Sequence, residues 1–407
     1  MPRIFSGIQP SGELHIGNWL GAVRNWVNLQ HSYETLFCVV DLHAITGKYE
    51  HESLSQRTRE MAIGLLAAGI DPERATLFIQ SHVPEHAELQ WLLNTVTPLG
   101  ELERMTQFKD KAQRFESVPA GLLNYPILMA ADILLYRADL VPVGEDQIQH
   151  LELSREIARK WNAEFGRGEH FFPEPEPILS EAKRITGLDG QAKMSKSMGN
   201  TIGLLDSPDE IWQKLRPAKT DPARVTRRDP GTPEVCNIYH LHQYFSPPET
   251  VALVAENCRG AKWGCLDCKR VLADNMIAAL APIRERALEL REQSERVDEI
   301  LADGAATAHR MAAETMREVR DRMGLLSPTA QALSARREPG LQLGSTPYSG
   351  GPVGKDHQGC GRAWGLRPAH QGRRCLSGPN QWQAGSSHQA AADAGPDQVH
   401  RPEVDEQ

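Results

Sequence analysis

Short apolar runs alternate with longer helical stretches through roughly the first 180 residues. Runs rich in β-branched residues stand at 3–6, 36–40, 76–81 and 140–143, and a stretch of helical periodicity follows each of them, beginning near Gly17, Ser53, Glu85 and Glu145. Strands and helices that take turns in this way are typical of βαβ units on a parallel sheet. The pattern predicts an α/β fold, with a Rossmann-like, doubly wound parallel-sheet domain over residues 1–206.

The pattern changes beyond residue 206. Strand-like runs disappear, and helices broken by proline-rich turns predict a second, helical domain over 207–297. From Leu301 to Met323 the apolar side chains are three and four residues apart, so one amphipathic helix is expected over 298–326, packing back on the body. Glycine and proline make up 19 of the 70 residues from 338 to 407, which predicts a disordered low-complexity tail.

Charge and hydropathy narrow the possible functions. The 407 residues include 45 Lys and Arg against 53 Asp and Glu, for a net charge of -8. A histone-like polycation is therefore excluded, and any nucleic-acid contact must come from local basic patches. The mean hydropathy is -0.45, and the sequence lacks both a membrane-length apolar run and a signal-peptide pattern. We expect no membrane partner and a reducing cytoplasm, where the seven cysteines would be thiols or metal ligands.

Two segments suit a nucleotide. Residues 10–18 follow a predicted strand and open a helix, so Gly17 would admit a bound group close to the backbone while the first N–H groups attract phosphate, with His15 and Asn18 adding donors. An ordinary βα loop is an equally good reading of this segment alone. In the second segment, 193–197, Lys193 and Lys196 alternate with hydroxyl groups, as in a mobile loop that gathers phosphate oxygens or in a solvated charged loop.

The positions of these segments favour nucleotide binding. The first lies in the first βα turn and the second lies beyond the last parallel strand, so one crevice could receive both. Neither GxxxxGK[ST] nor GxGxxG occurs in the chain, which disfavours a P-loop NTPase or a dehydrogenase.

Four cysteines form a separate constellation. Cys236, Cys258, Cys265 and Cys268 are spaced C-x21-C-x6-C-x2-C within the predicted helical domain. Structural zinc usually has two close pairs, whereas four thiolates with a wider span also suit a [4Fe–4S] cluster. Basic residues and one tryptophan around them suit an RNA loop, although each could belong to a solvated helical surface. These residues are Arg224, Arg227, Arg228, Arg259, Lys262, Trp263, Lys269 and Arg270.

At this point the chain resembles a known family. PSGELHIGN and KMSKS are similar to the HIGH and KMSKS signatures of class I aminoacyl-tRNA synthetases, and FSGIQPSG, DLHAIT, GELERMTQFK, LMAADILLY, VPVGEDQ and QHLELSREIA resemble bacterial tryptophanyl-tRNA synthetases. The resemblance covers about residues 1–326. It implies a Rossmann core, a homodimer, activation of L-tryptophan with ATP, and transfer to tRNA(Trp). The cysteine pattern resembles a subset of that family with a [4Fe–4S] cluster near the anticodon-reading surface, so we place the cluster first, as a structural group, and zinc second.

The resemblance also implies an ATP site. Gln9, Lys111, Lys193 and Lys196 are expected to stabilise the charge on the reacting phosphates, with Mg²⁺ helping, since positioning and charge dominate phosphate chemistry of this kind. For Lys111 a solvated surface lysine is the alternative reading. The residues expected to bind ATP are Gln9, Pro10, Ser11, His15, Gly17, Asn18, Gly144, Glu145, Asp146, Ile185, Lys193, Met194, Ser195, Lys196 and Ser197.

The amino-acid pocket can be argued partly from spacing. Tyr125, Met129 and Asp132 are four and three residues apart, which places them on one helical face. A carboxylate on an apolar face is costly unless a donor meets it, and an indole N–H is such a donor. A local cap or salt bridge is the alternative for Asp132. The resemblance adds a clamp for the substrate ammonium, made by Tyr125 and Gln147, and further pocket residues: Phe5, Gly7, His43, Val141 and Val143.

Two other functions stay open at this stage. Tyrosine specificity would need a second polar partner for a phenol hydroxyl, and the apolar setting of Met129 argues against it. A non-catalytic RNA-binding or redox-sensing paralogue would have no use for Gln9, Asp132, Lys193 and Lys196, all of which are present.

Overall fold

The computed structural model describes residues 1–113, 115–179, 185–195 and 198–326. All of them belong to one compact unit, Met1–Glu338, which is distinct from a second unit, Pro339–Gln407. The predicted tail at 338–407, and Lys196 and Ser197 of the second nucleotide segment, lie outside the described residues. The domain boundaries at 206 and 297 fall within the first unit and stay a prediction.

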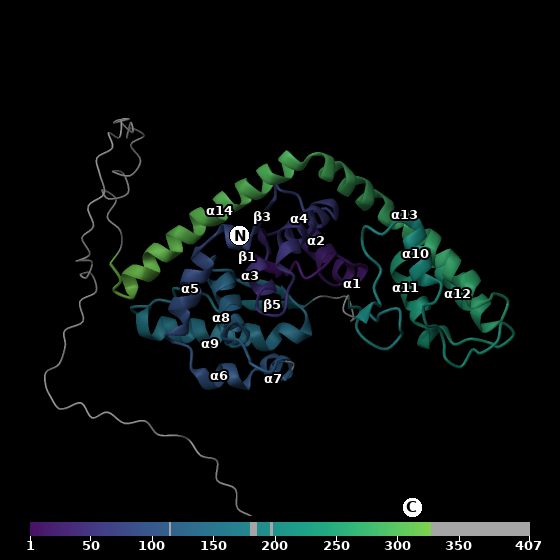
Figure 1. Cartoon of the computed structure of the whole chain (residues 1–407), viewed down its shortest axis with the longest axis horizontal. Helices are drawn as coiled ribbons and strands as arrows, with labels where there is room; N and C mark the ends of the chain where they lie inside the picture. Colours follow the sequence, from purple (N-terminus) through teal and green to yellow (C-terminus); the bar gives the residue numbers. More distant parts are fainter. Residues whose placement is uncertain (114, 180–184, 196–197, 327–407) are drawn as a thin grey trace, which may run out of the picture. The chain divides into compact units, whose positions relative to one another are not determined.

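The described residues form a five-stranded parallel sheet in the order β3-β2-β1-β4-β5 (Figure 1). The strands are β1 (Arg3–Ile8), β2 (Glu34–Val39), β3 (Ala75–Ile79), β4 (Leu140–Val143) and β5 (Glu176–Leu179). The chain lays β2 and β3 on one side of β1 and then crosses to lay β4 and β5 on the other. Ligands of doubly wound sheets bind where the order reverses, at the carboxyl ends of the strands, which here are β1 and β4. The predicted fold class is confirmed.

Helices connect and cover these strands. They are α1 (Ile16–Asn18), the π-helical turn η1 (Trp19–Val23), α2 (Arg24–Leu29), α3 (Asp41–Ala44), α4 (His51–Ala67), η2 (Gln80–His82), α5 (Glu85–Asn94), α6 (Leu99–Arg104), α7 (Thr106–Ala112), α8 (Ala120–Leu134), η3 (Glu145–Gln147) and α9 (Ile148–Phe165). In β2, residues 35–39 are buried without alternation, as expected for a central strand that helices cover on both faces. Helix α8 packs against α5 and α9 and also contacts β1.

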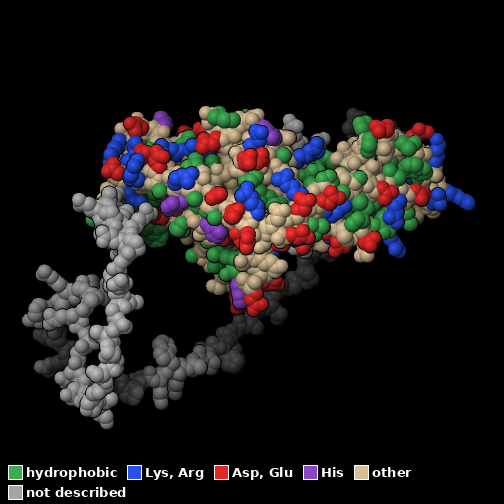
Figure 2. Space-filling view, turned by 90° about the horizontal axis from the view of Figure 1, so that it is seen from above, with side chains coloured by type: hydrophobic (Ala, Val, Ile, Leu, Met, Phe, Trp, Pro, Cys, Tyr) green, Lys and Arg blue, Asp and Glu red, His purple; other side chains and the backbone are tan. Residues whose placement is uncertain are grey.

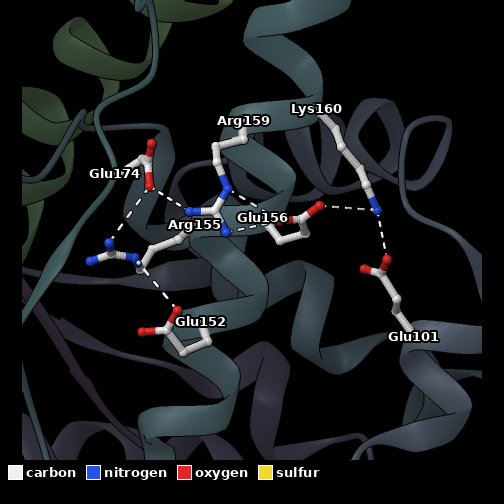
Figure 3. Close-up of polar contacts among 7 residues, drawn as sticks. All are labelled: Glu101, Glu152, Arg155, Glu156, Arg159, Lys160 and Glu174. Carbon is white, nitrogen blue, oxygen red and sulfur yellow. Dashed lines mark hydrogen bonds and ion pairs between the residues drawn. The ribbon is translucent and has the colours of Figure 1, made fainter.

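The outer face of α9 carries a network of ion pairs (Figure 3). Arg159 reaches Glu174 at 2.6 Å, Arg155 reaches the same carboxylate at 3.6 Å, and Lys160 reaches Glu101 of α6 at 2.6 Å. The network therefore joins α9 to α6 and to the segment before β5. Exposed ion pairs are each worth about 1 kcal/mol or less, so the apolar inner face of α9 supplies most of the packing energy.

The described residues beyond 206 form helices. These are α10 (Pro208–Leu215), η5 (Pro233–Val235), α11 (Asn237–Phe245), α12 (Pro248–Arg259), α13 (Cys265–Glu292) and α14 (Ser294–Arg322). Helix α13 packs on α4, α10 and α11, while α14 runs over β3, as Figure 1 shows. The last contact is close, because a Cβ added at Gly304 would lie 1.9 Å from the carbonyl oxygen of Leu77. Helix α14 begins four residues before the amphipathic helix predicted over 298–326 and ends four residues before its predicted end.

The surface carries charges of both signs. On the face in Figure 2, Lys and Arg side chains are interspersed with Asp and Glu rather than gathered into one basic field. Within the described part of the chain, no helix is both long enough and apolar enough to span a bilayer.

Candidate active site

The segment after β1 forms its own helix start. The N–H of Asn18 donates to Nδ1 of His15, and the N–H of His15 donates to Oδ1 of Asn18, both at 3.3 Å. This reciprocal pairing is a capping arrangement that satisfies two backbone donors at the beginning of α1. The two predicted ATP-binding side chains therefore also set the direction in which the chain enters the helix.

The two nucleotide segments lie side by side. A Cβ added at Gly17 would lie 3.3 Å from Cβ of Met194, so the glycine permits this close approach. Backbone bonds join the same regions, since the N–H of Ile16 donates to the carbonyl oxygen of Ile202 at 3.0 Å. Segments that are distant in the sequence thus meet at the carboxyl end of β1, where Gln9 and Ser11 are exposed and Pro10 is buried.

The second segment is held as a tight loop. Thr186 forms an antiparallel bridge with Lys193, and the N–H of Met194 donates to the carbonyl oxygen of Ile185 at 3.0 Å. Asn200 is buried inside the loop: its Oδ1 accepts from the Ser195 N–H at 2.8 Å. Its Nδ2 donates to Oδ2 of Asp189 at 2.7 Å. The loop thus presents an exposed Lys193 to solvent.

A third segment predicted to bind ATP lies next to the loop of Lys193. Gly144, Glu145 and Asp146 follow β4 and are exposed. Nζ of Lys193 lies 3.9 Å from Oδ1 of Asp146, so the loop and this segment face each other. Nε2 of Gln107 donates to the carbonyl oxygen of Asp146 at 3.1 Å, which ties α7 to the same place.

Asp132 of α8 is a buried carboxylate with several hydrogen-bond partners. It is 2 % exposed, and its Oδ2 accepts from Nε2 of His43 at 2.8 Å. Its Oδ1 accepts from Nε2 of Gln80 at 2.7 Å and from Nδ1 of His86 at 2.6 Å. Burial acts to raise the pKa of Asp132, but the hydrogen bonds and charges of His43 and His86 outweigh it and hold that pKa below its ordinary value. The carboxylate is therefore a buried anion.

The other residues predicted to form the pocket lie on several elements, and of these only His43 has a hydrogen bond to this carboxylate among the described residues. Met129 and Gln147 are half-buried and Gly7 is exposed; the buried members are Phe5, His43, Tyr125, Val141 and Val143. The ring of His43 meets that of Tyr125 edge-on, with 6.3 Å between centroids. Phe5 of β1 and Val141 and Val143 of β4 belong to one buried apolar cluster, and Met129 of α8 packs against it.

Tyr125 is held on two sides. Its Oη lies 2.9 Å from Nε2 of His150 and donates to Oε1 of Gln107 at 3.2 Å, and Nζ of Lys111 lies 4.7 Å from its ring centroid. Burial raises the pKa of Tyr125 to about 12. Burial, followed by the charges of Lys111 and His43, lowers the pKa of His150 to about 4. Among the described residues Tyr125 makes no hydrogen bond to Gln147, its predicted partner in the ammonium clamp.

Five residues of the site escaped sequence reasoning: Gln80, His86, Gln107, Tyr136 and His150. One signal could have found two of them, because Gln80 and His86 follow the carboxyl end of a buried strand, where doubly wound sheets bind ligands. The other three lie within helices or at a helix end, and no local pattern separates them from ordinary helical positions.

The four cysteines lie around α11, α12 and α13. Burial, followed by the charges of Cys236, Cys258 and Cys265, raises the pKa of Cys268 to about 12. These thiols are therefore near enough to interact, yet within the described part of the chain no three His, Cys, Asp or Glu side chains come together as a ligand set for a metal ion. The sequence-predicted metal site is thus not shown.

Two of the basic residues near these cysteines are buried. Arg224 is 9 % exposed and donates to Sγ of Cys258 at 3.7 Å, and among the described residues its Nε has no hydrogen-bond partner. Lys269 is 5 % exposed and donates to the carbonyl oxygens of Arg216 and Ala218. The cationic groups of these two residues therefore point into the protein and not onto a solvated surface.

Known proteins with the same combination of features identify the family. The family described as tRNA synthetases class I (W and Y) matches residues 1–281. A tryptophan–tRNA ligase of Deinococcus radiodurans is 55% identical over 331 residues, which are 80% of this chain and 99% of that protein. One from Parasynechococcus marenigrum is 49% identical over 79% of this chain and 98% of its own length.

A solved structure agrees. The tryptophanyl-tRNA synthetase of Campylobacter jejuni, complexed with ADP and tryptophan, matches with a TM-score of 0.74 and 37% identity over 79% of this chain and 100% of that chain. The chain therefore belongs to the class I tRNA synthetases, and within them to the bacterial tryptophanyl-tRNA synthetases.

Proposed function

We propose that this chain activates L-tryptophan with ATP and then transfers the tryptophanyl group to tRNA(Trp). The observation that carries the proposal is the meeting of the segment after β1, containing Gly17, with the loop of Met194, together with the buried carboxylate of Asp132 in α8. Exposed polar groups suit the phosphates, and buried apolar groups suit an indole ring.

In the first step, a tryptophan carboxylate oxygen bonds to the α-phosphorus of ATP, the bond to the β-phosphate breaks, and pyrophosphate leaves. In the second, a ribose hydroxyl of the terminal adenosine of tRNA attacks the activated carbonyl carbon, and AMP leaves. Neither step needs a protein nucleophile, so positioning and charge stabilisation carry the catalysis. Bound Mg²⁺ would neutralise phosphate charge.

The roles of the nucleotide residues follow from their chemistry. Lys193 and Lys196 would hold the leaving pyrophosphate, and Lys111 and Gln9 would assist at the phosphates. The distance of 3.9 Å between Lys193 and Asp146 supports this role for Lys193, because it places the lysine over the segment that follows β4. The remaining predicted residues of these segments would contact the nucleotide through their backbone or short side chains.

Specificity would rest on Asp132. A carboxylate buried among apolar side chains accepts a hydrogen bond from the indole N–H and is left short of one donor when phenylalanine binds, which costs about 1 to 3 kcal/mol. Tyrosine is disfavoured because Met129, rather than a polar side chain, lines the same helix face. The relatives named tryptophan–tRNA ligase support the same substrate.

Tryptophan-dependent exchange of pyrophosphate into ATP tests this function. The wild-type chain should catalyse exchange with tryptophan and not with tyrosine, and Lys193→Ala should slow it about a hundredfold. Lys262→Ala is the matched control, since Lys262 is exposed and pairs with Glu256 far along the chain. No exchange with tryptophan would refute the activity, and exchange with tyrosine would reassign it.

We further propose that Cys236, Cys258, Cys265 and Cys268 bind a structural [4Fe–4S] cluster, with zinc as the second choice. The proposal is supported by the two buried cations beside these cysteines, because Arg224, which donates to Sγ of Cys258, and Lys269, which follows Cys268, would offset the charge of a negative site. Zinc requires all ligands about 2.3 Å from one point, whereas a polynuclear cluster accepts thiolates that are farther apart. Since the pKa of Cys268 is raised to about 12, binding must displace its proton.

Metal analysis after anaerobic purification tests this proposal. A brown protein with about four irons per chain, lost in Cys258→Ser but kept in Cys38→Ser, would support the cluster. A colourless protein with one zinc per chain would select zinc. A chain with neither metal would contradict both.

The division of the chain is part of the proposal. Residues 1–206 would form the catalytic domain, 207–297 the anticodon-binding domain, and 298–326 a helix returning to the body. The chain would also work as a homodimer, as in the family. It would act in the cytoplasm, where ATP and tRNA are available. Sedimentation at micromolar concentration tests the dimer, which a monomeric mass would contradict.

A further inference from the structure

A buried polar network continues behind Asp132. His86 is fully buried; its Nδ1 lies 2.6 Å from Oδ1 of Asp132, and its Nε2 lies 2.7 Å from Oη of Tyr136. Tyr136 is buried as well and stands at the end of α8, while His86 belongs to α5. The network therefore fastens α8 to α5 immediately beneath the pocket.

The positions of the protons follow from the geometry. A bare nitrogen at Nδ1 would place its lone pair against the carboxylate, so Nδ1 carries a proton and donates to Asp132. The second ring nitrogen, Nε2, shares a hydrogen bond with the hydroxyl of Tyr136. The hydroxyl keeps its proton, because burial, followed by the negative charges of neighbouring groups, raises the pKa of Tyr136 well above its ordinary value. The hydrogen-bonded series Tyr136, His86 and Asp132 thus ends on the carboxylate.

Aromatic packing fixes the orientation of the Tyr136 and His86 rings. The ring of Tyr136 stacks on Phe5, with 5.6 Å between centroids and 11° between planes, and Phe78 meets it edge-on. Phe78 also packs on the ring of His86. With these rings held in place, the imidazole cannot rotate without losing both of its hydrogen bonds.

The donors are distributed unequally over the carboxylate. Among the described residues, Gln80 and His86 both donate to Oδ1, whereas only His43 donates to Oδ2. A carboxylate has about four acceptor positions, two on each oxygen, so Oδ1 is saturated and Oδ2 can accept one more hydrogen bond. A fourth donor is therefore directed to a single atom.

We propose that His86, held by Tyr136, is a positioning residue for recognition of the indole N–H: it saturates Oδ1 of Asp132 so that the substrate donates to Oδ2 alone. This inference deepens the proposed function and rests on it. His86 does not touch the substrate. It acts by keeping the carboxylate ionised and in one orientation, so its loss should lower the selectivity for an N–H group more than it lowers nucleotide binding.

The test compares tryptophan with β-(3-benzothienyl)alanine, in which sulfur replaces the indole N–H. The readout is the ratio of kcat/KM for the two substrates in pyrophosphate exchange. In His86→Leu the ratio should fall about tenfold, as expected for loss of one hydrogen bond to a charged group, while the KM for ATP stays within about twofold. His86→Asn keeps a donor near the Nδ1 position and should recover most of the ratio.

Two further variants keep the test decisive. Tyr136→Phe removes only the hydroxyl and should lower the ratio about threefold even if His86→Leu does not fold. His82→Asn is the matched control, because His82 is exposed on η2, outside the network. Ratios in the folded His86 and Tyr136 variants equal to that of the wild-type chain contradict the inference alone. A wild-type chain that gives no tryptophan-dependent exchange overturns the proposed function and the inference with it.

Discussion

Two buried side chains near the pocket respond to burial in opposite ways. Asp132 stays ionised because three donors meet its oxygens. His150 is equally buried, but one of its nitrogens, Nδ1, has no hydrogen-bond partner among the described residues, so the neutral imidazole is favoured. At the scale of single residues, the number of partners decides whether a buried group is charged.

The state of His150 makes stability depend on pH. Its pKa is lowered to about 4 in the folded chain, against 6.5 for an ordinary histidine, so between these values the unfolded chain binds a proton that the folded chain does not. Folding therefore weakens as the pH falls through this window, by about 2 kcal/mol at pH 5 for this group. Above pH 6.5 the effect vanishes.

Denaturant unfolding at pH 7 and pH 5 measures this dependence. The variant His150→Gln keeps a donor toward Tyr125 and removes the titration, so its loss of stability at pH 5 should be smaller by about 2 kcal/mol. Part of the slope should remain, because the pKa of His242 is also lowered to about 4. His170→Gln, at an exposed position, serves as the control. Equal losses in the wild-type chain and His150→Gln would argue against this origin.

Spacing along the chain predicts the position of Asp132 but not its surroundings. Its distance of seven residues from Tyr125 is a local property of one helix, readable as helical periodicity. Its donors His43, Gln80 and His86 come from α3, η2 and α5, which only the folded sheet brings together. A local pattern therefore indicates that a carboxylate needs partners without saying which they are.

At the scale of elements, a strand could be predicted from the sequence only when helices cover both of its faces. The first four strands of the sheet follow apolar runs, because strands covered on both faces require continuous hydrophobic residues. β5 carries Pro177 and lies at the edge of the sheet, where its residues are exposed or half-buried, so its sequence has no such signal. The helical start near Gly17 was expected, but its π-helical turn, η1, was not.

The loop that holds Lys193 depends on one buried amide. Asn200 bonds both the Ser195 N–H and the Asp189 carboxylate, so Asn200→Ala should loosen the loop at both ends. We expect the KM for ATP to rise and kcat for exchange to fall, about tenfold in kcat/KM, because one or two hydrogen bonds of about 1 kcal/mol each are lost.

Tryptophan binding without ATP provides the contrast for this variant. It should be unchanged in Asn200→Ala, since the loop residues are distinct from those around Asp132. Gln191→Ala is the control, because the side chain of Gln191 is exposed in the same loop. A weakened tryptophan affinity in Asn200→Ala, or an equal effect of both variants, would count against a local role in the loop.

At the scale of the whole molecule, the fold joins distant parts of the chain through its helices. Helix α13 contacts α4, and α14 contacts β3 and α5, so the last described helices pack on the first half of the chain. The parallel sheet was predictable from alternating strands and helices, whereas these long-range helix contacts have no signature in any one segment. Interspersed surface charge agrees with a moderate net charge of -8.

The residues after the last described helix should be dispensable for amino-acid activation. Relatives such as the Deinococcus radiodurans enzyme align over 99% of their own length while covering only 80% of this chain, so a complete family member fits within that part. The described residues all belong to the unit Met1–Glu338. A chain truncated after residue 337 should therefore keep its melting temperature within about 2 °C. Its tryptophan-dependent exchange should match that of the full chain, and tRNA charging assayed in parallel would reveal any role in the second step. Slower exchange by the truncated chain would mean that residues 338–407 support the site itself.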